Sequence, residues 1–150
     1  MTPLQRLVLN MSMNSIVDVL IEAVRESFGI QLQRGYRIAK ETIIDTPTQV
    51  ALELVGANVA LRFSVDRREG IVDLYVAKVI DGRAAERGSG QYFNSLTGYL
   101  REKGVFWETR DIRSDVDYPL EHKIRADVRE YADVINNLAI SIATDTELFT

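Results

Sequence analysis

The sequence contains no cysteine and only one histidine, and these two absences exclude much familiar chemistry. Without cysteine the chain cannot form a disulfide framework, an iron–sulfur cluster, a thiolate zinc site or a cysteine nucleophile. With one histidine it cannot build a metal site that needs several imidazole ligands. We therefore expect no metal and no cofactor, and we expect a protein that is not an enzyme.

Long hydrophobic runs are also missing. No segment approaches the roughly 18 uncharged apolar residues that a transmembrane helix requires. The first thirteen residues are interrupted by polar side chains such as Arg6 and Asn10, so they lack the apolar core of a signal peptide. We therefore expect a cytoplasmic protein that does not contact a membrane.

The 150 residues include 22 acidic and 18 basic side chains, which gives a net charge of -4. This length fits one domain over residues 1–150, because roughly 100–200 residues per domain is usual. An acidic chain lacks a broad basic surface, so we expect no direct contact with nucleic acid. The acid surplus is local, since the net charge is -1 over residues 1–30, +1 over 31–90 and -4 over 91–150. Such a C-terminal part would steer a basic protein partner into contact, and ordinary solubility is the alternative explanation.

Helices are indicated where apolar residues recur every three or four positions. One such segment is Asn14–Phe28, for which we expect a cap at Ser12 or Asn14 and a left-handed end at Gly29. A short helix around Phe93–Leu100 should end at Gly104. A long helix should begin at Pro119, with a stripe formed by Leu120, Ile124, Val128, Tyr131, Ile135, Leu138 and Ile142.

Between these helices the apolar period falls from about 3.6 to about 2 residues, which is typical of strands. The alternation predicts strands over residues 50–55, 59–65 and 72–80, joined by connections too short for parallel crossovers. A further strand within Tyr36–Ile44 and another over residues 105–109 are weaker predictions, and Asp81–Gly90 is interpreted as a mobile connection. The sequence therefore predicts an α+β fold with an antiparallel β-meander of three or four strands, or five with residues 105–109. One face of this sheet should be covered by the N-terminal, middle and long C-terminal helices.

Two sets of residues are candidates for acid–base chemistry. His122 titrates near neutral pH but lies off the apolar stripe of the long helix, so a solvated surface histidine is the better interpretation. Glu53 and Asp73 both alternate away from the expected core face, and paired carboxylates can serve as acid and base. Arg62 on the intervening strand could instead pair with them and simply stabilise the sheet surface. No Gly-x-Ser-x-Gly turn supports a serine nucleophile.

A segment rich in acidic residues, RDIRSDVDYPLE, leads into the long helix. Its carboxylates do not follow the spacing of a calcium loop and it lacks the required glycine, so we expect no metal site there. Asp117 is instead placed to cap the helix. Because interfaces concentrate their energy in a few aromatic and charged residues, we predict a partner-binding surface in and beside this segment. It comprises Glu108, Asp111, Asp115, Asp117 and Glu121, with Trp107 and Tyr118 as aromatic anchors; packing of Trp107 in the core is the alternative.

The segment NVALRFSVDRREGIVDLYVAKV joins two alternating strands through a charged turn. Over about residues 48–80 this pattern resembles small bacterial immunity proteins, which neutralise co-encoded toxins and include those of contact-dependent growth inhibition systems. The size, the acidity, the absence of cysteine and the α+β layout are similar as well. The resemblance implies a cytoplasmic protein that blocks a toxin, often a nuclease, and it transfers no individual site residue.

The leading hypothesis is therefore a non-catalytic, immunity-type protein that neutralises a cognate, basic toxin domain through an acidic surface. One alternative is a small enzyme that uses carboxylates in a cleft between sheet and helices, which requires a buried carboxylate beside a pocket. Another is an oligomeric structural or adaptor protein, which requires a large exposed apolar patch. The sequence leaves the identity of the partner and the oligomeric state open.

Overall fold

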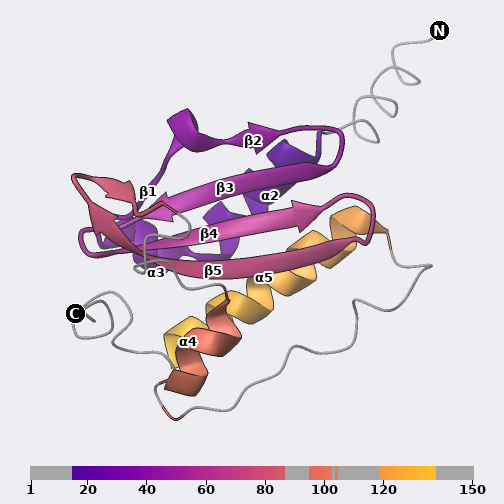
Figure 1. The fold of residues 1–150 in the computed structure, drawn as a ribbon. Helices are drawn as coiled ribbons and strands as arrows, with labels where there is room; N and C mark the ends of the chain where they lie inside the picture. The colour runs from indigo at the N-terminus through magenta and orange to yellow at the C-terminus, as the bar shows by residue number, and fades with distance from the viewer. Residues whose placement is uncertain (1–14, 87–94, 103, 105–118, 138–150) are drawn as a thin grey trace, which may run out of the picture.

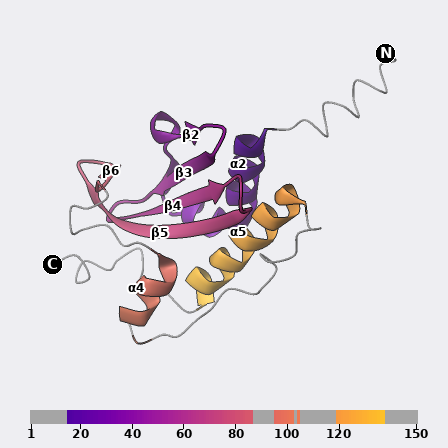
Figure 2. The same ribbon diagram turned by 45° about the vertical axis from the view of Figure 1, so that its right-hand side comes forward.

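The computed structural model describes residues 15–86, 95–102, 104 and 119–137, and these form an antiparallel sheet with helices on one side (Figure 1). The α+β class predicted from the sequence is confirmed. Helices α2 and α5 pack against each other and against the sheet, as Figure 2 shows from a second direction. The elements in chain order are α2 (Ile16–Ser27), α3 (Gly29–Gln33), β1 (Arg37–Ile38), the 3-10 turn η1 (Lys40–Thr42), β2 (Ile44–Asp45), β3 (Gln49–Val55), β4 (Val59–Asp66), β5 (Ile71–Ile80), β6 (Arg83–Ala84), α4 (Leu96–Glu102) and α5 (Leu120–Asn137).

The three long strands follow the predicted alternation. They pair antiparallel in the order β3-β4-β5, so that Leu52 lies opposite Phe63 and Phe63 lies opposite Leu74. These three side chains belong to the helix-facing side of the sheet, where Phe63 also meets Phe28 of the α2–α3 junction edge to face at 5.2 Å between ring centroids. The other side of the same strands carries a polar row in which Glu53 lies opposite Arg62 and Arg62 lies opposite Tyr75. One face of the sheet is thus a dry core, and the opposite face presents polar groups.

The predicted strand within Tyr36–Ile44 is broken into two short pieces. Both β1 and β2 pair with β3, because Ile38 lies opposite Leu54 and Ile44 lies opposite Ala51. Five residues, 39–43, therefore face only residues 52–53 of β3, and the surplus forms the bulge that contains η1. This bulge explains the poor alternation of the segment. Together with β6, it raises the number of strands to six, above the expected three to five.

The helix predicted over Asn14–Phe28 is present as α2, with two corrections at its ends. The N-cap is Ser15, whose Oγ accepts a hydrogen bond from the backbone N–H of Asp18, instead of Ser12 or Asn14. Gly29 does not end the helix in a left-handed conformation; it begins α3, and the left-handed residue is Gly35 with a φ of 96°. Gly104 adopts the left-handed conformation expected after the middle helix, with a φ of 78°.

The prediction of a mobile connection over Asp81–Gly90 is wrong for its first part. Asp81 and Gly82 have φ values of 53° and 77°, the two left-handed residues of a two-residue hairpin turn. This turn joins β5 to β6, where Val79 pairs with Ala84. The α5 helix follows Pro119 as predicted, with Ile124, Val128 and Ile135 buried against the core.

Candidate functional site

Six of the seven residues predicted to bind a partner lie outside the described part of the chain: Trp107, Glu108, Asp111, Asp115, Asp117 and Tyr118. Only Glu121 is described, and it lies in the first turn of α5. The prediction for the other six remains a prediction. The predicted strand over residues 105–109 and the end of the long helix from Leu138 to Ile142 also lie outside the described residues.

Glu121 belongs to a cluster of carboxylates that the fold brings together from two helices. Arg125 of α5 contacts Glu22 of α2 at 2.9 Å, Glu26 of α2 at 3.6 Å and Glu121 at 3.6 Å. The packing of α2 on α5 creates this arrangement, which we call the acidic helix patch. Three carboxylates minus one guanidinium leave it with a net charge of -2. No local sequence pattern indicates that the carboxylates of α2 join Glu121, because the contact depends on how the two helices pack.

The acidic helix patch is exposed to solvent and its charges are held in place. The side chains of Glu22, Glu26 and Glu121 are 55%, 58% and 44% exposed, whereas the side chain of Arg125 is 29% exposed. The hydrogen bond that Arg125 donates to Glu22 raises the pKa of its guanidinium, with further contributions from the charges of Glu22, Glu26 and Glu121. The patch thus presents surplus negative charge on the outer surface of the helical layer.

A second cluster lies on the opposite, polar face of the sheet. As predicted, Glu53 and Arg62 face each other across β3 and β4, and their charged atoms lie 3.7 Å apart. Glu53 is far more buried than a surface residue, since it is only 6% exposed. It lies beside a pocket of about 330 Å³, and an adjoining pocket of about 450 Å³ includes Asp73 in its lining. Both pockets share Gln49, Ser64 and Tyr75.

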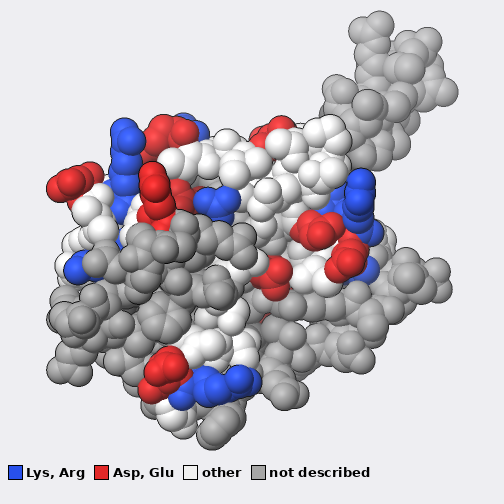
Figure 3. Space-filling view, in the orientation of Figure 1, with Lys and Arg blue, Asp and Glu red and all other residues white. Residues whose placement is uncertain are grey.

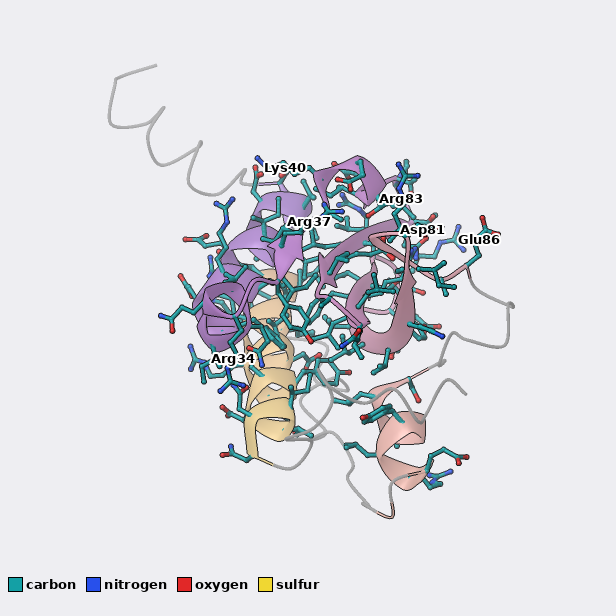
Figure 4. The ribbon with its side chains drawn as sticks, turned by 90° about the vertical axis from the view of Figure 1, so that its left-hand side faces the viewer. Arg34, Arg37, Lys40, Asp81, Arg83 and Glu86 are labelled. Atoms are coloured by element: carbon teal, nitrogen blue, oxygen red, sulfur yellow. The ribbon has the colours of Figure 1, made fainter. Side chains whose placement is uncertain are left out.

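The first of these cavities, which we call the sheet-face pocket, has walls from both edges of the sheet. On one side the bulge of the broken edge strand contributes Thr42, and on the other β6 and the following residues contribute Ala84, Ala85 and Glu86. The two edges meet where Arg37 of β1 donates a hydrogen bond of 3.2 Å to the carbonyl oxygen of Gly82. Figure 4 shows Arg37, Asp81 and Arg83 together at this end of the sheet. The pocket therefore lies on the face away from α2 and α5, and not between sheet and helices as the enzyme alternative assumed.

A small apolar cluster closes this end of the polar face. Ala39, Val55 and Ala60 are buried together, with Val79 and Ala84 packed against them. Outside this apolar cluster, Arg37 also forms an ion pair with Glu41, at a distance of 2.9 Å. A hydrogen bond from its own backbone and then the one from Arg37 lower the pKa of Glu41. The end of the pocket is thus fixed by packing and by hydrogen bonds.

The surface around these sites carries charges of both signs. In the orientation of Figure 3, acidic and basic side chains are interspersed over the described surface. His122 is exposed, in agreement with its interpretation as a surface residue. Within residues 15–86, 95–102, 104 and 119–137, no group of three or more histidine or carboxylate side chains is placed to hold a metal ion. In the same residues, no helix combines the length and the apolar character needed to cross a membrane.

Comparisons with known proteins give no further indication. No protein-family model matches the chain, and neither curated proteins nor solved structures gave a match.

Proposed function

We propose that this protein is a non-catalytic binding protein of immunity type, which neutralises a cognate toxin by covering it with an acidic surface. The observation that carries the proposal is the acidic helix patch, in which Glu22, Glu26 and Glu121 surround the single guanidinium of Arg125. Glu121 was predicted to bind a partner, and the two glutamates of α2 enlarge that surface with the same sign of charge. The complementary partner is a basic protein domain.

Physical arguments support this use of the patch. Like charges on an exposed surface attract a basic partner over a distance of about 10 Å at moderate salt, and so they raise the association rate. Arg125 keeps the three carboxylates close together while leaving a net negative charge. Because α2 and α5 are packed on a common core, the charges need little reorganisation when a partner binds.

The proposal is tested first by finding the partner. A tagged copy of the chain is recovered from its source cell, and the copurifying proteins are identified by mass spectrometry. We expect a basic protein whose expression alone arrests growth and whose activity is abolished by a stoichiometric amount of this chain. A partner without toxic activity, or neutralisation that requires turnover of a substrate, would contradict the immunity function.

The contribution of the patch is tested with two variants of equal net charge. One carries Glu22→Gln, Glu26→Gln and Glu121→Gln, and the control carries Glu69→Gln, Asp81→Asn and Glu102→Gln at exposed positions elsewhere. At low ionic strength we expect the patch variant to associate with the partner about tenfold more slowly, with the difference shrinking as salt is added. An equal loss in the control variant would show that only overall charge matters.

One observation favours a second candidate, a small enzyme that uses carboxylates on the polar face of the sheet. Glu53 is buried beside the sheet-face pocket, and Asp73 lines the adjoining one. This function predicts that a metabolite extract loses a compound catalytically when the protein is added, and that the Glu53→Gln variant, once shown to be folded, leaves the compound intact. Equal loss with wild type and variant, or no loss with either, would exclude Glu53 as a catalytic group in that extract.

For the oligomeric adaptor, the described part of the chain offers little support. The large apolar side chains that it exposes are Ile30 and Ile80, which are 46% and 44% exposed and lie on different elements. Two separate side chains do not make the continuous apolar patch that this function requires.

A further inference from the structure

The charged pair at the centre of the sheet-face pocket is only loosely joined. The nearest charged atoms of Glu53 and Arg62 are 3.7 Å apart, which is longer than a hydrogen bond. Within the described residues neither side chain makes a hydrogen bond to the protein. Both are substantially buried, since the side chains of Glu53 and Arg62 are 8% and 23% exposed. A carboxylate and a guanidinium are thus held side by side at a pocket, and both retain capacity to bind another group.

Besides Glu53 and Arg62, the lining includes a second acidic residue, Glu86, together with neutral polar groups and a small apolar wall. Ser64 Oγ accepts a hydrogen bond of 2.8 Å from the side-chain amide of Gln49, so its own hydroxyl hydrogen can still be donated. Ala84 and Ala85 form the wall on the β6 side. The volume of about 330 Å³ is at the small end of the range of roughly 300–1,000 Å³ for ligand pockets. A small polar molecule fits this pocket better than a drug-sized one.

The charge arrangement discriminates between classes of ligand. A purely anionic group that paired with Arg62 would also approach the carboxylate of Glu53, and a purely cationic group on Glu53 would also approach Arg62. In a partly desolvated site such like-charge contacts are costly. A ligand that carries both charges on neighbouring atoms avoids both repulsions, because its anion can pair with Arg62 while its cation pairs with Glu53.

We propose that the sheet-face pocket binds a free α-amino acid, with the carboxylate of the ligand on Arg62 and its ammonium group on Glu53. The side chain of the ligand extends into the adjoining pocket, which is lined by Asp66, Asp73 and Arg68. Because the adjoining pocket has two carboxylates and one guanidinium in its lining, it should favour a ligand whose side chain is basic or neutral and polar over one whose side chain is acidic. This site is separate from the acidic helix patch and does not depend on the proposed toxin-binding function.

The binding test uses the purified chain and NMR or calorimetric titration with arginine, serine and glutamate. Agmatine, which lacks the carboxylate of arginine, and N-acetylarginine, which lacks its ammonium group, are the matched controls. We expect arginine to bind most tightly, and we expect each control to bind about tenfold or more weakly. Binding of agmatine or N-acetylarginine as tight as that of arginine would overturn the zwitterion assignment, and no binding of any amino acid at millimolar concentration would overturn the site.

Variants locate the binding in the pocket. Arg62→Gln and Glu53→Gln should each weaken arginine binding about tenfold or more, whereas the exposed controls Arg34→Gln and Glu102→Gln should leave it unchanged. If removal of one partner of the buried pair unfolds the protein, Ser64→Ala gives a milder test, for which we expect a loss of about fivefold. Unchanged binding in folded pocket variants would contradict the proposal. Neutralising Glu22, Glu26 and Glu121 should not alter arginine binding, so failure here and failure of the toxin-binding function are distinguishable.

Discussion

Replacement of Gly56 by alanine should destabilise the protein because of one side chain that packs on this glycine. A Cβ atom at Gly56 would lie 2.5 Å from Cζ of Tyr36 and within 2.8 Å of both neighbouring ring carbons. Favourable carbon–carbon contacts are about 3.5–4.0 Å long, so the ring would have to move by about 1 Å. Tyr36 is part of the main core and is 7% exposed, which leaves the ring little room to move.

The expected cost of Gly56→Ala is about 1–3 kcal/mol, the range for overpacking a core. The sign of this change in stability is informative, because Gly56 is not among the glycines with a positive φ. Without the clash, an alanine there would stabilise the protein by about 0.4–1 kcal/mol by restricting the unfolded chain. Urea unfolding followed by circular dichroism measures the change. As a matched control, Gly29→Ala places a Cβ with nothing within 4 Å and should be neutral or stabilising. In a Tyr36→Ala background the cost of Gly56→Ala should vanish; the same cost in both backgrounds, or no cost in either, would refute the steric explanation.

Three further predictions concern the pH dependence of stability, a left-handed glycine and a buried hydrogen bond. Burial raises the pKa of Tyr36 to about 12 from 10.0, so the folded state favours the protonated phenol more than the unfolded state does. The free energy of unfolding should therefore fall as the pH rises from about 10 through 12, by up to about 3 kcal/mol relative to Tyr36→Phe. Unfolding at a series of alkaline pH values checks this, and parallel curves for the two proteins would contradict it. Gly82→Ala should lower the free energy of unfolding by about 1–2 kcal/mol because Gly82 has a φ of 77°, and nothing lies within 4 Å of the new Cβ to add a clash. Gly82→Asn should lower it less in the same unfolding assay, because asparagine tolerates this conformation better. Tyr131→Phe removes the hydrogen bond of 2.7 Å to the carbonyl oxygen of Val72 and should lower the free energy of unfolding by about 0.5–1.5 kcal/mol, and an unchanged urea midpoint would count against it.

The regular part of the fold could be predicted from the sequence because its signals are local. Strict alternation identified β3, β4 and β5, and the apolar stripe identified α2 and α5. The break in the edge strand has no such signal. The break depends on contacts with residues far along the chain. The N–H of Ala39 donates a hydrogen bond to the carbonyl oxygen of Glu53, and the side chain of Ala39 packs with Val55 and Ala60.

Two errors have a different origin. The Asp81-Gly82 pair, which directly follows the apolar residues Val79 and Ile80, is a strong hairpin signal, so β6 is predictable from the sequence. At the end of α2, by contrast, two glycines follow closely, and nothing local distinguishes them. Gly35, and not Gly29, adopts the left-handed conformation because the chain continues into α3 before it turns toward β1.

The candidate sites were predictable only in part. Alternation placed Glu53, Arg62 and Asp73 outside the core, but it could not reveal that Glu53 would be buried. That burial arises where the bulge containing Thr42 and the hairpin leading to Glu86 flank the same strip of β3, and both walls are set by tertiary contacts. Likewise Glu121 was identified from the acidic segment, while its neighbours on α2 depend on helix packing.

The two candidate sites lie on opposite sides of the sheet, and this arrangement has a consequence for how they act together. Helices α2 and α5, which carry the acidic helix patch, cover one face of the sheet (Figures 1 and 2), and the sheet-face pocket is lined by residues of the other face. Between them lies the main core, including Leu52, Phe63 and Leu74, which is closely packed and transmits little deformation unless it has two alternative arrangements. Substitutions in the patch and in the pocket share no contact, so their effects on stability should add within about 0.5 kcal/mol. Binding of a partner to the helices should then not change the affinity of the sheet-face pocket for an amino acid. A change in arginine affinity when the partner binds would require that the sheet itself shifts.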